Sequence, residues 1–412
     1  MTSRSDRPYD IIVFGATSFV GEILCRYIVE RHGTDGDLAW AIAGRNEAKL
    51  AAVAEATGAD VARIVADAGD PDAMAELAES TRLVISTVGP YALYGSELVA
   101  AVAAAGTDSV DLTGEPQWMQ RMIDTHSTTA EANGARIVHT CGFDSIPSDL
   151  GVWFTQGQAS ARFDEPCTKI AMRVKAMKGG ASGGTIASMI NVVDETKADP
   201  ELRTTLGNPY ALAPERMRSG PRQPNVMRPT KDVVSGEWIG PFVMAGINTK
   251  VVHRSHALLD RPWGAGFTYD EAMLMGDSPL GAAKAAALVG GLGGLMSLAA
   301  LGPARGLLNK MLPKPGEGPS PAQQESGFFD LRFFGTTASG DTITTKVTGD
   351  RDPGYGSTAK MLAESATTLL ATDRNETTGT PGGFWTPATA MGDQLIEALV
   401  EHAGLTFEVI ES

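Results

Sequence analysis

The sequence predicts an α/β protein in which a doubly wound parallel sheet is followed by a second, mixed or antiparallel sheet with helices on one face. Short apolar runs alternate with amphipathic segments through the first 150 residues, as in parallel sheets covered on both faces. After about Ile146 this alternation stops, and strand-like runs follow one another with few crossovers. The 412 residues exceed one ordinary core, so we expect two domains.

The strands of the first sheet are short apolar runs, which is typical of strands buried on both faces. They are predicted at Asp10–Phe14, Leu38–Ala43, Val61–Ala66, Leu83–Thr87, Ser109–Leu112 and Arg136–Thr140. A helix is predicted after the first strand from its apolar spacing, and another at Asp70–Pro71, where a capping carboxylate precedes proline. Two more helices are predicted over Ser96–Ala105 and Pro116–Asn133.

The second part of the chain is less regular. A strand over Thr168–Met177 leads into the glycine-rich turn Lys178–Gly184 and a helix that opens at Thr185. The segment Asp199–Lys231 has no period and is rich in Pro and Arg, so we expect a long loop or lid. Strands are predicted at Asn248–Arg254, Gly266–Met275 and Phe328–Val347, and helices at Thr358–Ala371 and Ala388–His402.

Composition excludes several classes of function. The formal net charge of −15 argues against a nucleic-acid partner, which needs a basic face. Three widely spaced cysteines form no CxxC pair and favour a reducing compartment, and the six histidines show no metal-ligand spacing, so we expect no metal. The polar N-terminus lacks the apolar core of a signal peptide, which predicts a cytoplasmic protein.

One apolar segment qualifies that expectation. Leu280–Leu301 carries a single charge and is long enough to span a bilayer. It is rich in Ala and Gly, which contribute little to insertion, so a buried or interfacial helix is favoured over a span. The basic flank Ala304–Lys314 would suit an anionic surface, and residues 280–314 are therefore a candidate for peripheral contact with the inner face of the plasma membrane.

The segment "IIVFGATSFVGE" predicts a nucleotide-binding turn between a strand and a helix. Gly15 allows the sharp turn, Gly21 lets the helix pack close to the strand, and the helix N-terminus supplies N–H donors for a diphosphate. Ser18 stands where such turns usually have a glycine, but it is small and its hydroxyl could donate to a phosphate oxygen. We expect the cofactor to contact Gly15, Thr17, Ser18, Phe19, Val20 and Gly21.

The residue after the second strand favours NADP(H) over NAD(H). Where an acidic residue would hold the ribose 2′-hydroxyl, the chain has Arg45, whose guanidinium can grip a 2′-phosphate, and Lys49 follows four residues later. A solvated arginine on a loop is the alternative. Asp67, after the third strand, is a candidate for the adenine amino group, although a capping or surface role is equally consistent with its position.

Two further segments are expected at the same edge of the sheet. "STVGPYALYG" turns away from the fourth strand at Val88, Gly89 and Pro90, near the expected nicotinamide ribose, and brings Tyr91 and Tyr94 close to the chemistry. "CGFDSIPSD" offers Asp144 beside a helix N-terminus, where a capping role is at least as consistent as catalysis. Gly183, Gly184 and Thr185 form a second potential anion site, for the substrate, or else a plain turn.

Together, "FGATSFVGE", "AGRNEAKL", "STVGPYALYG", "VDLTGEPQW" and "CGFDSIPSDLG" resemble the saccharopine dehydrogenase-like oxidoreductases. The likeness continues through "KGGASGGTIASM", "NTKVVHRSHALL", "DPGYGSTAKML" and "GGFWTPATAMGD", and with these the chain is most similar to the mycobacterial trans-acting enoyl reductases. The likeness spans nearly the whole chain. The family usually shows "GATGFVG", from which Ser18 departs.

The resemblance implies a Rossmann-type domain formed by residues 1–147 and 352–412, with an α+β substrate domain, residues 148–351, inserted between. It implies NADPH as cofactor and reduction of a carbon–carbon double bond in a lipid-like polyketide chain, in trans to a synthase without its own enoyl reductase. An oxidoreductase acting on saccharopine-like imine or amino-acid substrates is the alternative within the enzymes. A non-catalytic NADP-binding protein at lipid surfaces is the alternative outside them.

Enoyl reduction needs a group that stabilises the enolate oxygen and one that protonates the α-carbon. Tyr94, Tyr91 and Asp144 are the candidates, and water could serve equally. Because acyl-carrier domains are typically acidic, the arginines of the loop are candidates for docking one, with a solvated lid as the alternative. They are Arg216, Arg218, Arg222 and Arg228.

Overall fold

The first sheet of this computed structural model is all-parallel, with strand order β13-β6-β5-β4-β1-β2-β3. The residues that the structure describes are 6–179, 191–192, 194–196, 198–199, 202–300, 318–374 and 380–411, with only the backbone described over 295–300. The strands are β1 (Tyr9–Phe14), β2 (Trp40–Gly44), β3 (Ala62–Val65), β4 (Thr81–Ser86), β5 (Asp108–Asp111), β6 (Arg136–Val138) and β13 (Gly383–Trp385).

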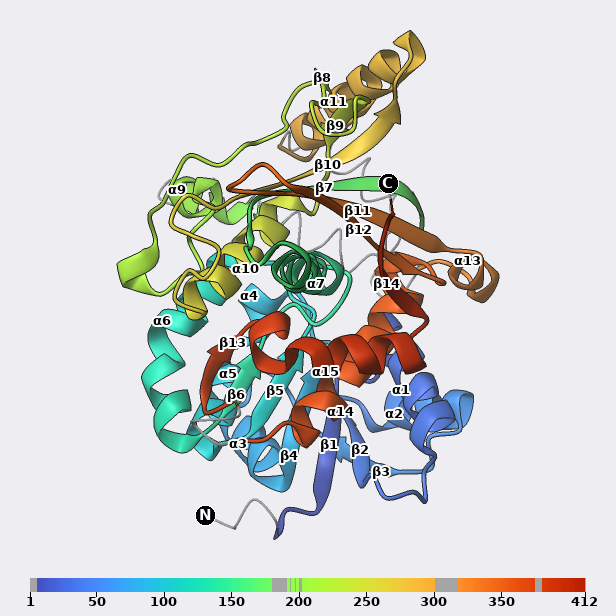
Figure 1. Cartoon of the computed structure of the whole chain (residues 1–412). Coiled ribbons are helices and arrows are strands. Elements are labelled where there is room, and N and C mark those ends of the chain that lie inside the picture. Colours follow the sequence, from blue (N-terminus) through green and yellow to red (C-terminus); the bar gives the residue numbers. More distant parts are fainter. Residues whose placement is uncertain are drawn as a thin grey trace.

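Helices cover both faces of this sheet (Figure 1). Successive side chains of a strand point to opposite faces: Ile11 and Val13 of β1 join one apolar cluster, and Ile12 and Phe14 join the other. The helices are α1 (Phe19–His32), α2 (Glu47–Thr57), α3 (Pro71–Ser80), α4 (Tyr91–Tyr94), α5 (Ser96–Ala105), α6 (Pro116–Asn133) and α14 (Thr358–Ala371). The predicted doubly wound architecture is therefore confirmed.

The second sheet is mixed, with strand order β14-β12-β11-β7-β10-β9-β8, and only β7 and β10 pair in parallel among its described strands. This confirms the predicted mixed sheet. Its strands are β7 (Cys167–Lys178), β8 (Thr230–Lys231), β9 (Trp238–Pro241), β10 (Thr268–Gly276), β11 (Phe328–Thr337), β12 (Thr342–Gly349) and β14 (Leu405–Val409).

Helix α7 (Ile146–Phe163) lies between the two sheets (Figure 1). It contacts β11 and β12 on one side and α15 (Pro387–His402) on the other. Gly151 permits this approach, because a Cβ there would lie 2.2 Å from the Phe333 ring. The helix therefore joins both layers into one apolar core.

Three expectations about elements need correction. Asn248–Arg254 is not a strand but part of helix α10 (Ala245–Leu258). Its paired valines favour a strand by propensity, yet the helix is buried on most sides, and Asn248, Lys250 and Arg254 donate to acceptors inside the protein. β14, which lies within residues 352–412, belongs to the second sheet, whereas the expected first domain includes all of these residues. The predicted strand run Phe328–Val347 is divided into two strands, β11 and β12.

Several short elements were not predicted at all. They are α4, α9 (Leu202–Gly207), the 3-10 turn η2 (Glu215–Met217), α13 (Pro321–Glu325) and the π-helical turn η3 (Pro353–Ser357), together with strands β8, β9, β13 and β14. Apart from α9, η2 and β8, the described part of 199–231 is largely irregular, as expected of a long loop.

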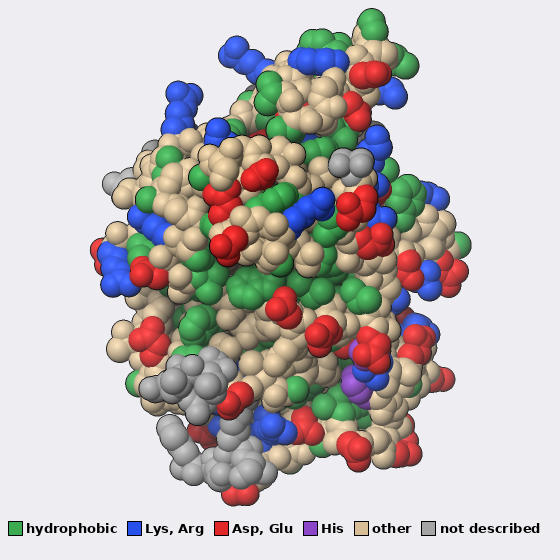
Figure 2. Space-filling model, in the orientation of Figure 1, with side chains coloured by type: hydrophobic (Ala, Val, Ile, Leu, Met, Phe, Trp, Pro, Cys, Tyr) green, Lys and Arg blue, Asp and Glu red, His purple; other side chains and the backbone are tan. Residues whose placement is uncertain are grey.

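Helix α11 (Pro279–Ala300) packs on β9 and β10, at the end of the molecule farthest from the parallel sheet (Figure 1). Within the described residues, no helix combines the length and apolarity needed to cross a membrane. Acidic and basic side chains are interspersed over the face drawn in Figure 2. Leu301 and the basic flank Ala304–Lys314 lie outside the described residues.

Candidate active site

The turn between β1 and α1 requires both of its glycines. Gly15 has φ +91°, and a Cβ there would lie 2.7 Å from Thr87 Oγ1 and from Val88 Cγ2. A Cβ on Gly21 would lie 2.3 Å from the carbonyl oxygen of Gly15. The turn therefore brings the backbone of α1 against the end of β1, beside the segment that follows β4.

Ser18 is the N-cap of α1, which explains its departure from glycine. Its Oγ accepts from the Gly21 N–H at 2.9 Å and lies 2.9 Å from Thr87 Oγ1. Because the Thr87 hydroxyl donates to the Gly15 carbonyl at 2.9 Å, we assign Ser18 as the donor to Thr87. The hydroxyl proton that was expected to reach a phosphate thus ties the turn to the end of β4.

The other residues of the predicted turn are divided between surface and core. Thr17 and Phe19 are half-buried, and the Phe19 ring packs edge-on against Tyr355, with centroids 5.1 Å apart. Val20 is in the core. The first N–H groups of a helix have no acceptor within it. Ser18 accepts from the N–H of Gly21, which leaves the amides of Phe19 and Val20 without an acceptor in the helix.

Arg45 directly follows β2, is exposed, and forms no hydrogen bond or ion pair with any described residue. The next carboxylate, that of Glu47, pairs with Arg63 at 2.8 Å, and Lys49 is exposed in the first turn of α2. Asp67 is exposed and its Oδ1 accepts from the Gly69 N–H at 2.9 Å, so one of its oxygens stabilises a turn.

The segment after β4 holds its two tyrosines very differently. Val88 and Pro90 are half-buried, Gly89 is exposed, and α4 follows. The Tyr91 hydroxyl is buried, donates to the Ser86 carbonyl at 2.9 Å and accepts from the Leu112 N–H at 3.4 Å. Burial, and then the charge of Asp111, raise its pKa well above the usual value.

Tyr94 is instead 43% exposed. The buried Glu115 carboxylate caps the N-terminus of α4, where it accepts from the Tyr91 N–H at 2.8 Å and from the Ala92 N–H at 2.9 Å. The structure therefore separates the two predicted tyrosines. Tyr91 is held by protein groups, whereas Tyr94 faces solvent, and the catalytic role of each stays a prediction.

A buried pair at the ends of β5 and β6 escaped the sequence analysis. Asp111 Oδ2 lies 2.6 Å from His139 Nδ1, and Asp111 Oδ1 accepts from the N–H groups of Thr113 and Thr140, at 3.0 and 3.2 Å. Thr140 has φ +62°, which is strained for a β-branched residue. His139 Nε2 has no partner among the described residues. The sequence signal that could have revealed this pair is that a carboxylate, Asp111, and an imidazole, His139, each stand near the end of a predicted strand.

Asp144 lies next to this pair and is only partly open to solvent. A Cβ on Gly114 or on Gly142 would lie 3.4 Å from one of its carboxylate oxygens, so two backbone segments flank the group. Burial, and then the negative charge of Asp111, raise the pKa of Asp144 to about 7. A carboxyl group with this pKa is half protonated near neutral pH and can act as a general acid.

A hydrogen-bonded chain connects this loop to the second sheet. Ser145 Oγ donates to Asn248 Oδ1 at 3.1 Å, and Asn248 Nδ2 donates to Glu271 Oε2 at 2.9 Å. The Tyr269 hydroxyl donates to the other Glu271 oxygen at 2.7 Å. All four side chains are buried, and burial raises the pKa of Glu271 to about 7.

The predicted substrate residues Gly183, Gly184 and Thr185 lie outside the described residues. The structure thus brings together at one sheet edge the β1–α1 turn, the segment after β4 and the 139–145 loop. No group of three or more metal-ligating side chains occurs in the described parts of the chain.

Comparison with known proteins identifies the family. The chain is 40% identical over 410 residues to a provisionally named trans-acting enoyl reductase of Mycobacterium tuberculosis, covering 96% of each chain. The chain belongs to the family of trans-acting enoyl reductases. Family members named trans-acting enoyl reductase from Mycobacterium ulcerans and Mycobacterium bovis are each 36% identical, covering 96% of this chain and 97% of theirs.

Structural comparison places this trans-acting enoyl reductase family member in a known fold. An apo saccharopine dehydrogenase (L-Glu forming) from Saccharomyces cerevisiae superposes with a TM-score of 0.54 over 98% of this chain and 100% of the yeast chain, at 14% identity. The fold is therefore that of saccharopine dehydrogenase, as the sequence motifs implied. No family model matches the sequence.

Proposed function

We propose that this protein is an NADPH-dependent enoyl reductase that acts in trans on a lipid-like acyl thioester. The observation that carries the proposal is the position of Asp144, a carboxyl group that is half protonated near neutral pH, at the sheet edge that also holds the β1–α1 turn. The names of the relatives support the reaction class. The fold supports a nucleotide at this edge, where open α/β sheets bind their ligands.

The residues present fit a dinucleotide. The backbone around Gly15 and Gly21 leaves no room for a Cβ, and the N–H groups of Phe19 and Val20 would hold the diphosphate. Arg45 would hold the 2′-phosphate, because it is exposed at the end of β2 and has no side-chain partner among the described residues. Bound there, NADPH would supply a hydride to the β-carbon of the enoyl group.

Asp144 would protonate the α-carbon of the enolate that hydride addition leaves. Tyr94 is exposed on α4, in the segment that follows β4, and is a candidate to donate a hydrogen bond to the thioester oxygen. The buried chain from Ser145 to Glu271 would keep the 144–145 loop in place.

The proposal extends to the setting of the reaction. Arg216, Arg222 and Arg228 are exposed and could dock an acidic carrier domain, whereas Arg218 is committed to an ion pair with Asp124. The exposed face of α11 is the proposed peripheral membrane contact, which would keep the protein at the inner face of the plasma membrane.

The test is turnover with a matched substrate panel. Purified protein is incubated with NADPH or NADH and enoyl thioesters of increasing chain length, and oxidation of the nucleotide is followed. Saccharopine, which is already a reduced secondary amine, is tested separately with NADP⁺ or NAD⁺, and reduction of the nucleotide is followed. The proposal expects oxidation of NADPH with at least one enoyl thioester. Nucleotide reduction with saccharopine, without turnover of any enoyl thioester, would favour the amino-acid oxidoreductase, and nucleotide binding without any turnover would favour the non-catalytic alternative.

A further inference from the structure

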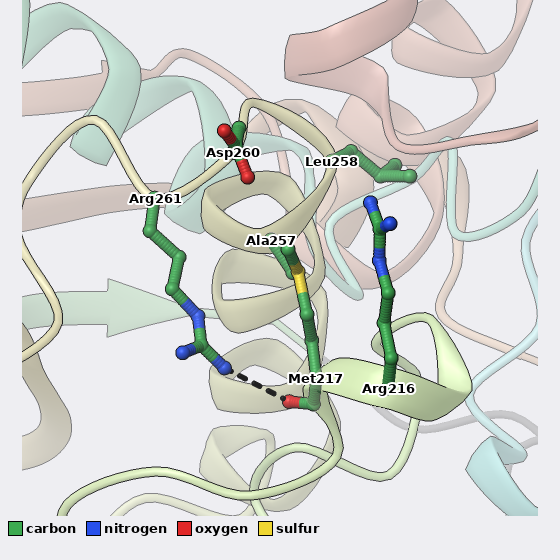
Figure 3. Close-up of a pocket in the computed structure, with 6 residues that line it drawn as sticks. All are labelled: Arg216, Met217, Ala257, Leu258, Asp260 and Arg261. Atoms are coloured by element: carbon green, nitrogen blue, oxygen red, sulfur yellow. Dashed lines mark hydrogen bonds between the residues drawn. The ribbon is translucent and has the colours of Figure 1, made fainter.

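A surface hollow of about 520 Å³ lies at the C-terminal end of α10, away from the β1–α1 turn. Figure 3 shows it between the last turn of α10 and the η2 segment. Its lining is Arg216, Met217, Ala257, Leu258, Asp260 and Arg261. Two guanidinium groups and one carboxylate therefore face the same space, which leaves the hollow with net positive charge.

The two arginines are held differently. Arg261 Nη2 donates to the carbonyl oxygens of Met217 and Ser219, at 3.4 and 3.1 Å, so its guanidinium is fixed at the wall. Arg216 is exposed and has no hydrogen bond or ion pair with the described residues; in Figure 3 its guanidinium extends beside Leu258. One guanidinium is thus in place and a second is free to close on a ligand.

The backbone that carries Arg261 is strained. Asp260 and Arg261 both have φ +59°, a conformation that non-glycine residues rarely adopt. The turn is maintained by the Arg261 N–H, which donates to the His256 carbonyl at 2.8 Å. Strained non-glycine backbone concentrates at ligand-binding sites, and here the strain positions the fixed guanidinium.

Next to the hollow lie two buried histidines, each with a ring nitrogen that has no partner among the described residues. An adjoining pocket of about 10 Å³ shares Met217, Ala257 and Arg261 with the hollow and is also lined by His253 and His256. His253 Nε2 and His256 Nδ1 have no hydrogen-bond partner among the described residues, and burial lowers the pKa of these histidines to about 3 and about 4. His256 Nε2 lies 3.1 Å from the Gly264 carbonyl oxygen and therefore carries the ring proton, so Nδ1 is an acceptor suited to a ligand N–H or O–H close to the anionic group.

We infer that this hollow binds the phosphate of a pantetheine-type acyl thioester, an inference that rests on the proposed function and names its substrate class. Arginine binds phosphate in a bidentate manner, and a pantetheine arm carries amide N–H and hydroxyl groups next to its phosphate. From Asn248, beside the 144–145 loop, to Leu258 at the hollow, α10 rises about 15 Å. This distance is within the reach of an extended pantetheine arm, so we place its phosphate at Arg216 and Arg261 and its thioester toward Asp144.

The test compares ligands with and without the phosphate. Binding of coenzyme A, 4′-phosphopantetheine and phosphate-free pantetheine is measured by calorimetry with NADP⁺ at saturation, so that the nucleotide turn is already occupied. We expect both phosphorylated ligands, or coenzyme A alone, to bind at least about tenfold more tightly than pantetheine. Tight binding of both phosphorylated ligands would assign the pantetheine phosphate to the hollow. Tight binding of coenzyme A alone would assign the phosphorylated nucleoside end of coenzyme A to it.

Arg216→Glu should remove this preference, and Arg261→Lys should weaken it. Arg162→Glu is the matched control, since it makes the same charge change on an exposed arginine at the end of α7, and it should leave the preference intact. Equal binding of pantetheine and the phosphorylated ligands, or a preference unaffected by Arg216→Glu, would overturn the inference.

Turnover separates this inference from the proposed function. Reduction of enoyl thioesters without any phosphate preference in binding would leave the proposed function intact and reject the hollow as the phosphate site. An Arg216-dependent preference without turnover of any enoyl thioester would support the hollow as a phosphate site and reject the enoyl reductase.

Discussion

Asp111 and His139, at the ends of adjacent strands, are joined by a 2.6 Å contact between Oδ2 and Nδ1. The second Asp111 oxygen accepts two backbone N–H groups, so the carboxylate is fixed in place. Its negative charge adds to burial in raising the pKa of Asp144. The pair therefore sets the environment of the proposed proton donor without being that donor.

Replacing Asp111 with Asn should shift the pH dependence of the reaction. Without the neighbouring negative charge the pKa of Asp144 falls, so the loss of kcat on the basic side should begin at lower pH than in the wild type. Asn keeps an oxygen for the two backbone donors. The measurement is the pH profile of kcat, with the exposed Asp37→Asn as control; an unmoved basic limb would contradict the coupling.

Asp144→Asn should remove the proton donor. We expect kcat to fall by about 10²–10⁴-fold, with little change in the affinity for NADPH. In the wild type, the acid form of Asp144 is lost as pH rises through about 7, and activity should decline over the same interval. Retention of full kcat by Asp144→Asn would assign proton delivery to water or to Tyr94.

The first sheet was predictable because local and tertiary preferences agree there. Ile11 to Phe14 form an apolar run that is buried on both faces, and Asp70 caps its helix as its sequence pattern indicated. Asn248–Arg254 was not predictable, since burial of polar residues such as Lys250 and Arg254 hides the apolar stripe by which a helix is recognised. Strand pairing over long separations, such as β13 with β6, leaves no local signal.

In the candidate site too, features set by local sequence were predictable and features set by long-range contacts were not. The Gly15–Gly21 turn was visible because its glycines serve local geometry. The pairing of His139 with Asp111 depends on which strands are neighbours, and the engagement of Ser18 with Thr87 depends on a contact across 69 residues. Such contacts arise from the fold and not from spacing along the chain.

The two small residues of the β1–α1 turn should respond differently to substitution. Ser18→Ala removes the N-cap and should lower the free energy of unfolding by about 1 kcal/mol, whereas Ser18→Gly should cost only a few tenths of that. Gly21→Ala places a methyl group 2.3 Å from the Gly15 carbonyl and should cost more than either. Denaturant unfolding measures all three; equal effects of Ser18→Ala and Gly21→Ala would contradict the geometry.

Glu271 should make stability depend on pH. Its pKa is raised from 4.5 to about 7 in the folded protein, so between these values the folded state holds a proton that the unfolded chain has released. Stability should therefore fall as pH rises through this window, by up to about 1.4 kcal/mol per pH unit for one group.

Glu271→Gln cannot lose a proton and should flatten this dependence, while the exposed Glu97→Gln should leave it unchanged. The measurement is urea unfolding at several pH values across the window. A slope that Glu271→Gln does not reduce would place the titrating groups elsewhere.

Nucleotide binding tests the central claim most directly. Fluorescence titration with NADPH and NADH should show NADPH bound at least about tenfold more tightly, and Arg45→Ala should abolish the difference while leaving NADH binding unaffected, because one charge-assisted contact to the 2′-phosphate is lost. Exposed Arg26→Ala is the control. Failure of the wild-type protein to bind either nucleotide at millimolar concentration would contradict the account.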